Sequence, residues 1–295
     1  MTTILQDLLG ITLVAFMIGS LFEVGLKLHF REAVAALCNA RFVTLSLLWA
    51  FGLCPMLALL LSRMVPLSEP YAIGLVLLGM APCAPFFPMF AKKAGGDFGY
   101  VAAFMILAAI GTVIFMPVAV PILIPGFAAD AWIIARPLVL YVAMPLVAGL
   151  LIHIIAQDFA DRAQPIVHRM TAIITILMLA LVLLIYGAEF LAAIGTFAIG
   201  VQMLFYVLAA GCSYILAYRL PDAQRSVIAL GVCTRNIGAA LAPVVAVPNL
   251  DRRVIVMVTL AAPLTLGCAA LMAWIFARFA MNRERLGKPP AGKSR

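Results

Sequence analysis

Charged residues and catalytic side chains are scarce in this sequence. Only 11% of the 295 residues are charged, with 12 acidic residues against 20 basic ones, and there are three histidines. The six cysteines are scattered through apolar stretches and form no CxxC pair. This spacing predicts neither a zinc site nor a disulfide scaffold, so the cysteines are interpreted as small packing residues. We therefore expect no metal centre and no cofactor.

Apolar residues, by contrast, make up 66% of the chain, and the mean hydropathy is +1.16. A soluble domain is about half apolar and about a quarter charged, so water cannot be the main solvent here. Charged or Pro/Gly-rich breaks leave nine apolar segments near the roughly 20 residues that span a bilayer as a helix. The segments are 4–29, 42–62, 71–91, 98–124, 133–156, 167–187, 191–218, 224–248 and 254–279. Because the connections are short, the prediction is one all-α polytopic membrane domain over residues 1–295.

The net charge of +8 does not indicate a nucleic-acid partner, because the bases lie in short connections and a tail. Their distribution instead predicts orientation, since Lys and Arg are retained on the cytoplasmic side. Arg235 lies within a span, fifteen bases share one side, and the other side holds Arg63, Arg136, Arg252 and Arg253. The N-terminus is therefore expected outside, with residues 280–295 as a basic cytoplasmic tail.

Two of the nine segments are interrupted. The third has Pro82, Pro85 and Pro88 within seven residues, and the eighth carries the polar run Thr234–Arg235–Asn236. A proline lacks the N–H and clashes with the preceding turn, so three together predict an unwound stretch within the membrane. The two segments are five crossings apart and so run in opposite directions. Paired interrupted spans indicate the binding site of a carrier; the alternative is that the prolines only kink packed helices.

Arg235 is the most informative single residue of these segments. A guanidinium within the hydrocarbon costs at least about 2.5 kcal/mol, so it is expected to face a polar cavity or a counter-charge. Two interpretations stay open. Arg235 binds an anionic substrate, or it forms a structural ion pair with Glu23 of the first span. The two can coexist, because a carboxylate that neutralises an empty site can yield to an anionic substrate.

Three motifs resemble a known transporter family. They are an early FMIG run followed by GLKLHF, a GMAPCAPFFP span followed by AGGD, and a late CTRNIGAALA span. In this order they resemble the bile acid:sodium symporter family, within the bile/arsenite/riboflavin transporter superfamily. The resemblance implies two inverted repeats, a panel domain and a core domain, and two discontinuous helices that cross. The nine segments correspond to the shortened form, with a truncated first repeat at about 4–124 and a complete second repeat at about 133–279.

The sequence departs from this family where sodium would bind. In sodium-coupled members the first broken helix has a Pro-Gly-Gly turn and a Ser-Asn pair, and the second has a Glu four residues before a Gln-Asn pair. Here Phe86 follows Pro85, Arg235 stands in place of the Gln, and Gly231 stands in place of the Glu. Sodium needs several oxygen ligands, and a fixed cation repels it. Sodium coupling is therefore doubtful.

The expected function is secondary transport of a small organic anion by alternating access, in the bilayer of a bacterial inner membrane, as the resemblance implies. The predicted substrate-binding residues are Pro85, Phe86, Thr234, Arg235 and Asn236. The alternatives are an intramembrane enzyme and a membrane receptor or sensor. An enzyme needs a nucleophile with its base, or a metal-ligand set, at membrane depth, and the chain shows neither pattern.

Overall fold

The computed structural model describes residues 2–28, 30–124, 131–246 and 250–285, and every regular element within these ranges is a helix. The first half contains α1 (Thr2–Lys27), α2 (Phe30–Leu37), α3 (Ala40–Leu47), η1 (Leu48–Leu53), α4 (Cys54–Met64), α5 (Glu69–Met80), α6 (Phe87–Lys93) and α7 (Phe98–Leu123). The second half contains α8 (Ala131–Leu138), η2 (Val139–Ala143), α9 (Met144–Ile155), α10 (Gln157–Ala192), α11 (Ala198–Leu216), α12 (Asp222–Cys233), α13 (Ile237–Ala246) and α14 (Arg252–Arg285).

The predicted all-α membrane fold is confirmed. Within the described ranges, seven helices are long and apolar enough to cross a membrane, and two of them continue through the π-helical turns η1 and η2. The pairs α5/α6 and α12/α13 add two broken crossings. Seven continuous helices and two broken ones make nine spans in the described chain, as predicted, and α2 lies outside them.

The helix ends differ from the predicted segments where a helix continues beyond its apolar part. α10 begins at Gln157, ten residues before the sixth predicted segment, because the polar residues at its start form helix without adding hydropathy. α14 likewise continues to Arg285, into the predicted tail, while residues 286–295 of that tail lie outside the described ranges. A hydropathy pattern detects the membrane-embedded part of a helix and not its full length.

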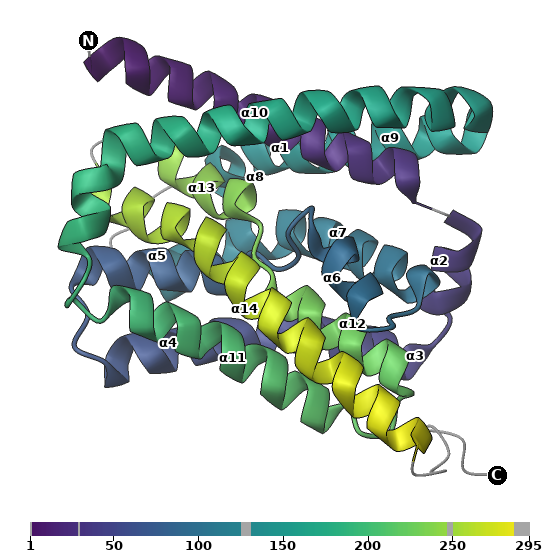
Figure 1. The fold of residues 1–295 in the computed structure, drawn as a ribbon. Helices are drawn as coiled ribbons and strands as arrows, with labels where there is room; N and C mark the ends of the chain where they lie inside the picture. The colour runs from purple at the N-terminus through teal and green to yellow at the C-terminus, as the bar shows by residue number, and fades with distance from the viewer. Residues whose placement is uncertain (1, 29, 125–130, 247–249, 286–295) are drawn as a thin grey trace.

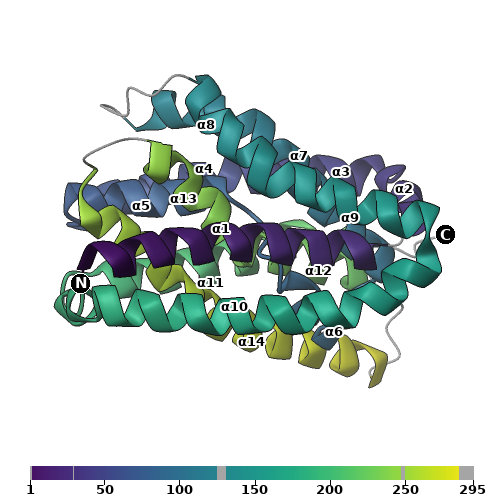
Figure 2. The same cartoon turned by 90° about the horizontal axis from the view of Figure 1, so that it is seen from above.

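The helices form two layers, as Figure 1 shows. We call α1, α8, α9 and α10 the panel and α3–α7 with α11–α14 the core; α2 links the two. Figure 2 shows α1 between α10 and α9. α1 and α9 meet at a glycine pair: a Cβ on Gly25 would lie 2.4 Å from the Leu146 carbonyl oxygen, and one on Gly149 would lie 2.3 Å from that of Phe22. Small residues at such a crossing let helix backbones touch, which ties α1 to α9 within the panel.

Basic residues gather at one end of the bundle. The ends of α1, α9, α11 and α14 and the starts of α10 and α12 lie at the same end (Figure 1). These helix ends and the segments beside them carry Lys27, Arg162, Arg219 and Arg283, among others. We call this end the basic end.

Candidate functional site

The two broken helices cross and hydrogen-bond to each other at their breaks. The Cys83 backbone N–H lies 2.9 Å from the carbonyl oxygen of Thr234 and 3.1 Å from that of Gly231. The Asn236 N–H donates to the Ala81 carbonyl at 3.0 Å, and Pro82 and Arg235 form an antiparallel bridge. An unpaired backbone group in a membrane interior costs several kcal/mol, so each break supplies the partners that the other needs. The predicted crossing is confirmed.

The proline spacing explains where the first helix stops. α5 ends at Met80, and Pro82 and Pro85 lie in the irregular link, where no helical N–H is required. Pro88 lies in the first turn of α6, the position at which a missing N–H is harmless. Cys83 adopts a φ of 68°, a left-handed conformation that is uncommon for a residue with a Cβ. The two hydrogen-bond acceptors of its N–H help to hold it there.

The extended backbone of the second break directs neighbouring side chains to different sides of the crossing. Thr234 has φ and ψ of −82° and 137°, and its hydroxyl donates back to the Leu230 carbonyl at 2.9 Å. The Asn236 side-chain oxygen accepts from the Ala239 N–H at 3.1 Å and so caps α13. Asn236 also borders a cavity of about 10 Å³ between core and panel, which Leu21 lines as well.

Arg235 points into the core, away from the panel. It is fully buried, its guanidinium lies 4.8 Å from the centre of the Phe205 ring of α11, and its Nη1 donates to the Gly79 carbonyl at 3.3 Å. Its Nε and Nη2 have no hydrogen-bond partner among the described residues, and no carboxylate in that part of the chain pairs with it. A cation–π contact with Phe205 and one hydrogen bond to a carbonyl compensate this buried charge directly.

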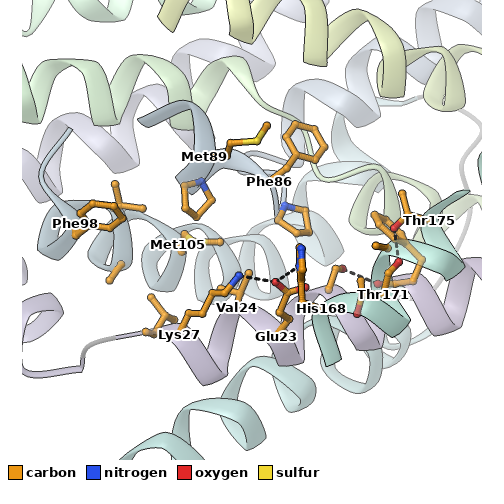
Figure 3. Close-up of a pocket in the computed structure, with 18 of the residues that line it drawn as sticks. Glu23, Val24, Lys27, Phe86, Met89, Phe98, Met105, His168, Thr171 and Thr175 are labelled. Carbon is orange, nitrogen blue, oxygen red and sulfur yellow. Dashed lines mark hydrogen bonds and ion pairs between the residues drawn. The ribbon is translucent and has the colours of Figure 1, made fainter. Parts of the chain in front are cut away.

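The ion pair considered between Glu23 and Arg235 is absent. Glu23 instead accepts from Lys27 Nζ at 2.6 Å and lies 2.9 Å from His168 Nδ1 of α10, as Figure 3 shows. Lys27 is one turn along α1, so the helix geometry itself brings the two charges together. Glu23 lies toward the basic end of α1, while Arg235 lies on the side of the crossing that faces away from the panel.

A cavity of about 710 Å³ separates the panel from the core. Its panel wall is mixed: the polar side chains on it are Ser20, Glu23, Lys27, His168, Thr171 and Thr175, and apolar residues such as Phe16 and Val24 lie among them. Its core wall is apolar and comes from the first break, from α6 and from α7. It includes Pro85, Phe86, Met89, Val101 and Met105, and Figure 3 labels Phe86, Met89 and Met105. Glu32 of α2 also lines the space. This cavity accepts a solute with one apolar face and one polar or charged face.

A comparison with protein families identifies this arrangement. The model of the Sodium Bile acid symporter family matches residues 13–194, more than half of the chain. The chain belongs to this family. No curated protein matches the chain at a significant level. The match includes part of α1, the first broken helix and α10, and it ends before the second broken helix, which contains Gly231 and Arg235.

In this chain an aromatic ring occupies the place of the glutamate that sodium-coupled relatives have. Sodium-coupled relatives, as described above, have that residue at the position of Gly231. A Cβ on Gly231 would lie 2.4 Å from the ring of Phe104 of α7, and Phe104 also packs against Phe87, with 5.7 Å between ring centres. The absent carboxylate therefore leaves no vacant pocket. A carboxylate at position 231 cannot be added without moving Phe104.

The predicted site residues fall into three groups. Pro85 and Phe86 line the large cavity, Asn236 borders the small one, and Thr234 and Arg235 are fully buried within the core. The crossing brings the two breaks together, yet only one of them contributes to the wall of the large cavity. The panel residues Lys27 and His168 were not among the predicted site residues. The spacing of Glu23 and Lys27 was a usable signal, whereas the approach of His168 depends on how α1 packs against α10.

Replacing Gly231 with alanine tests how tightly Phe104 fills this place. We expect Gly231→Ala to lower the stability by about 1–3 kcal/mol, because the new methyl group overlaps a ring in a packed core. Phe104→Leu in the same chain should restore most of that loss by making room. The melting temperature of the purified protein, followed by intrinsic fluorescence, measures both. A matched control is Gly200→Ala on α11, where an added Cβ has no neighbour within 4 Å. Equal melting temperatures for all variants would contradict the packing.

Proposed function

We propose that this protein is a secondary transporter that moves a small organic anion by alternating access of its panel and core, without coupling to sodium. The most direct support is the cavity of about 710 Å³ between the two layers, which the first break borders. Membership of a symporter family sets the general class. The substrate charge and the coupling come from the residues around the crossing.

A fixed positive charge favours an anionic solute. Arg235 is buried without a carboxylate partner in the described chain, so its charge is weakly screened and acts over a longer range than in water. Lys27 adds a cation on the cavity wall, although Glu23 and Glu32 oppose it there. In this proposal Pro85 and Phe86 contact the solute, and Asn236 and Thr234 shape the crossing beside it. Arg235 acts through its field.

The same charge opposes sodium. A sodium ion at the crossing would be repelled by the Arg235 guanidinium and would lack the glutamate whose place the Phe104 ring occupies. We propose that Arg235 supplies permanently the charge that a bound ion supplies in sodium-coupled relatives. Transport then needs no sodium gradient, and the cavity needs no metal.

Uptake into proteoliposomes tests the charge assignment. A labelled bile acid and a labelled short carboxylate serve as anionic probes, each beside its neutral amide. We expect anion uptake with sodium to stay within about twofold of uptake with choline. We expect Arg235→Gln to weaken binding of the anion by about tenfold, from the Coulomb term of a buried charge, while the amide is unaffected. Arg63→Gln at the exposed end of α4 is the control.

Two results would count against this assignment. Uptake that scales with an inward sodium gradient in the unmodified protein, and does so equally in Arg235→Gln, would remove the argument that arginine replaces the ion. Equal losses for the anion and the neutral amide in Arg235→Gln would show that Arg235 only supports the fold.

The carboxylate of Glu23 should reduce the affinity for anions. Glu23 neutralises Lys27 and contacts His168, so Glu23→Gln leaves the cavity wall more positive. We expect the KM for an anionic probe to fall by about fivefold, as for one charge removed at the edge of a solvated cavity. Stability should change by less than about 1 kcal/mol, because Lys27 and His168 are more than half exposed. Glu69→Gln, an equal charge change at the exposed start of α5, is the control. A KM that rises, or one that falls equally in the control, would refute the role of Glu23.

The basic end is proposed to face the cytoplasm of a bacterial cell, with the N-terminus outside. Single cysteines at Lys92 and Arg252, which are exposed at opposite ends, test this with a membrane-impermeant thiol reagent on whole cells. The exposed Cys38 and Cys212 would react with the reagent and must first be replaced. The four other native cysteines are buried and can remain. We expect labelling at position 252 and none at 92. The reverse pattern would invert the orientation.

A further inference from the structure

A second cavity lies away from the panel, at the basic end of the core. It has a volume of about 580 Å³ and runs between α3 and the end of α11. On the α3 side it is lined by Ala40, Arg41, Thr44 and Leu45, and on the α11 side by Leu216, Tyr218 and Arg219. We call it the arginine groove. Nothing in the transport proposal uses it.

The arginine groove lies at the expected level of the membrane surface. It is formed where two membrane-spanning helices end, because one apolar span begins at Ala40 and another stops at Leu216. Its polar side chains therefore meet water or lipid headgroups, while the helices beyond them meet acyl chains. A ligand that fills this groove has to be compatible with both environments.

Two arginines line the groove, and no acidic side chain described in the structure pairs with either of them. Arg41 and Arg219 are both exposed, and neither forms an ion pair with a carboxylate in the described chain. Nearby Arg225 and Arg283 differ, because Asp222 pairs with both of them. The Arg219 guanidinium lies 5.5 Å from the centre of the Tyr218 ring, which favours a position beside the groove.

Apolar side chains continue from the groove along the bilayer face of the same two helices. Leu48 is one turn beyond Thr44 and is 47% exposed, and Leu216 is 56% exposed. Cys212, one turn before Leu216 on α11, is exposed as well. Residues one turn apart share a helix face, so an apolar strip extends from the two arginines into the hydrocarbon region. The groove thus presents cations at the surface and an apolar track below them.

We propose that the arginine groove binds an anionic phospholipid, with Arg41 and Arg219 holding its phosphate and the apolar strip contacting its acyl chains. Guanidinium groups match phosphate oxygens in geometry and charge. Basic pockets between membrane helices recognise anionic headgroups for the same reason. A zwitterionic lipid offers the same chains, but its own cation opposes the two arginines.

Native mass spectrometry of the full-length protein tests this site with phosphatidylglycerol and phosphatidylcholine of identical acyl chains. We expect the unmodified protein to retain phosphatidylglycerol preferentially. Arg41→Gln and Arg219→Gln should each weaken its binding by about fivefold, and the double variant by about 30-fold. Arg162→Gln with Arg169→Gln is the matched control, because both arginines are exposed at the basic end and do not line the groove. The control should change binding by less than about twofold.

Several outcomes would overturn the proposal. Equal retention of the two lipids by the unmodified protein would do so without any variant. The same would follow if the double variant kept its phosphatidylglycerol, or if the control lost as much. Glycerol phosphate that displaced the lipid at equal concentration would show a site for free anions. A dimer that light scattering detects in the unmodified protein and not in the double variant would show that a second copy covers the groove.

Discussion

The structure depends on satisfying two interrupted backbones inside the membrane. Pro82 and Pro85 interrupt the helix between Met80 and Phe87, and the N–H and C=O groups left without helical partners have to be satisfied inside the protein. The second break supplies partners for the N–H of Cys83 and the C=O of Ala81, and it receives partners in return. Because neither half can meet this demand alone, the crossing fixes α5, α6, α12 and α13 against each other. The other core helices pack around that fixed point.

The extended backbone at the crossing separates two kinds of chemistry. Arg235 is placed in the core against Phe205, while the next residue, Asn236, borders the interface with the panel. A charge that contacts no solute can still act on one, since the surrounding helices exclude water and screen it weakly. The large cavity lies elsewhere, between the layers, where a panel wall that carries polar side chains faces an apolar core wall. In the proposed transport the buried charge and the side chains that meet the solute are therefore different residues.

The sequence predicted the spans and the breaks because both depend on local composition. Apolar length indicates a span, and clustered prolines or embedded polar residues indicate an interruption. The contact of Glu23 with His168 could not be predicted in this way, because it depends on how α1 packs against α10, and neither could the turn of Arg235 into the core. The ring of Phe104 beside Gly231 is equally non-local. Pro85 and Phe86 were predicted to contact the substrate. They lie in the first break and line the large cavity.

The bonds within each layer indicate where movement is easiest. The crossing is held by backbone hydrogen bonds entirely inside the core, and the glycine contact between Gly25 and Gly149 holds α1 to α9 entirely inside the panel. Breaking either would expose polar groups or open a tightly packed helix pair, and both changes are costly in lipid. The boundary between the layers contains the cavity of about 710 Å³, so fewer contacts must be exchanged there. The proposed rocking of panel against core would preserve these interactions and change access to the cavity.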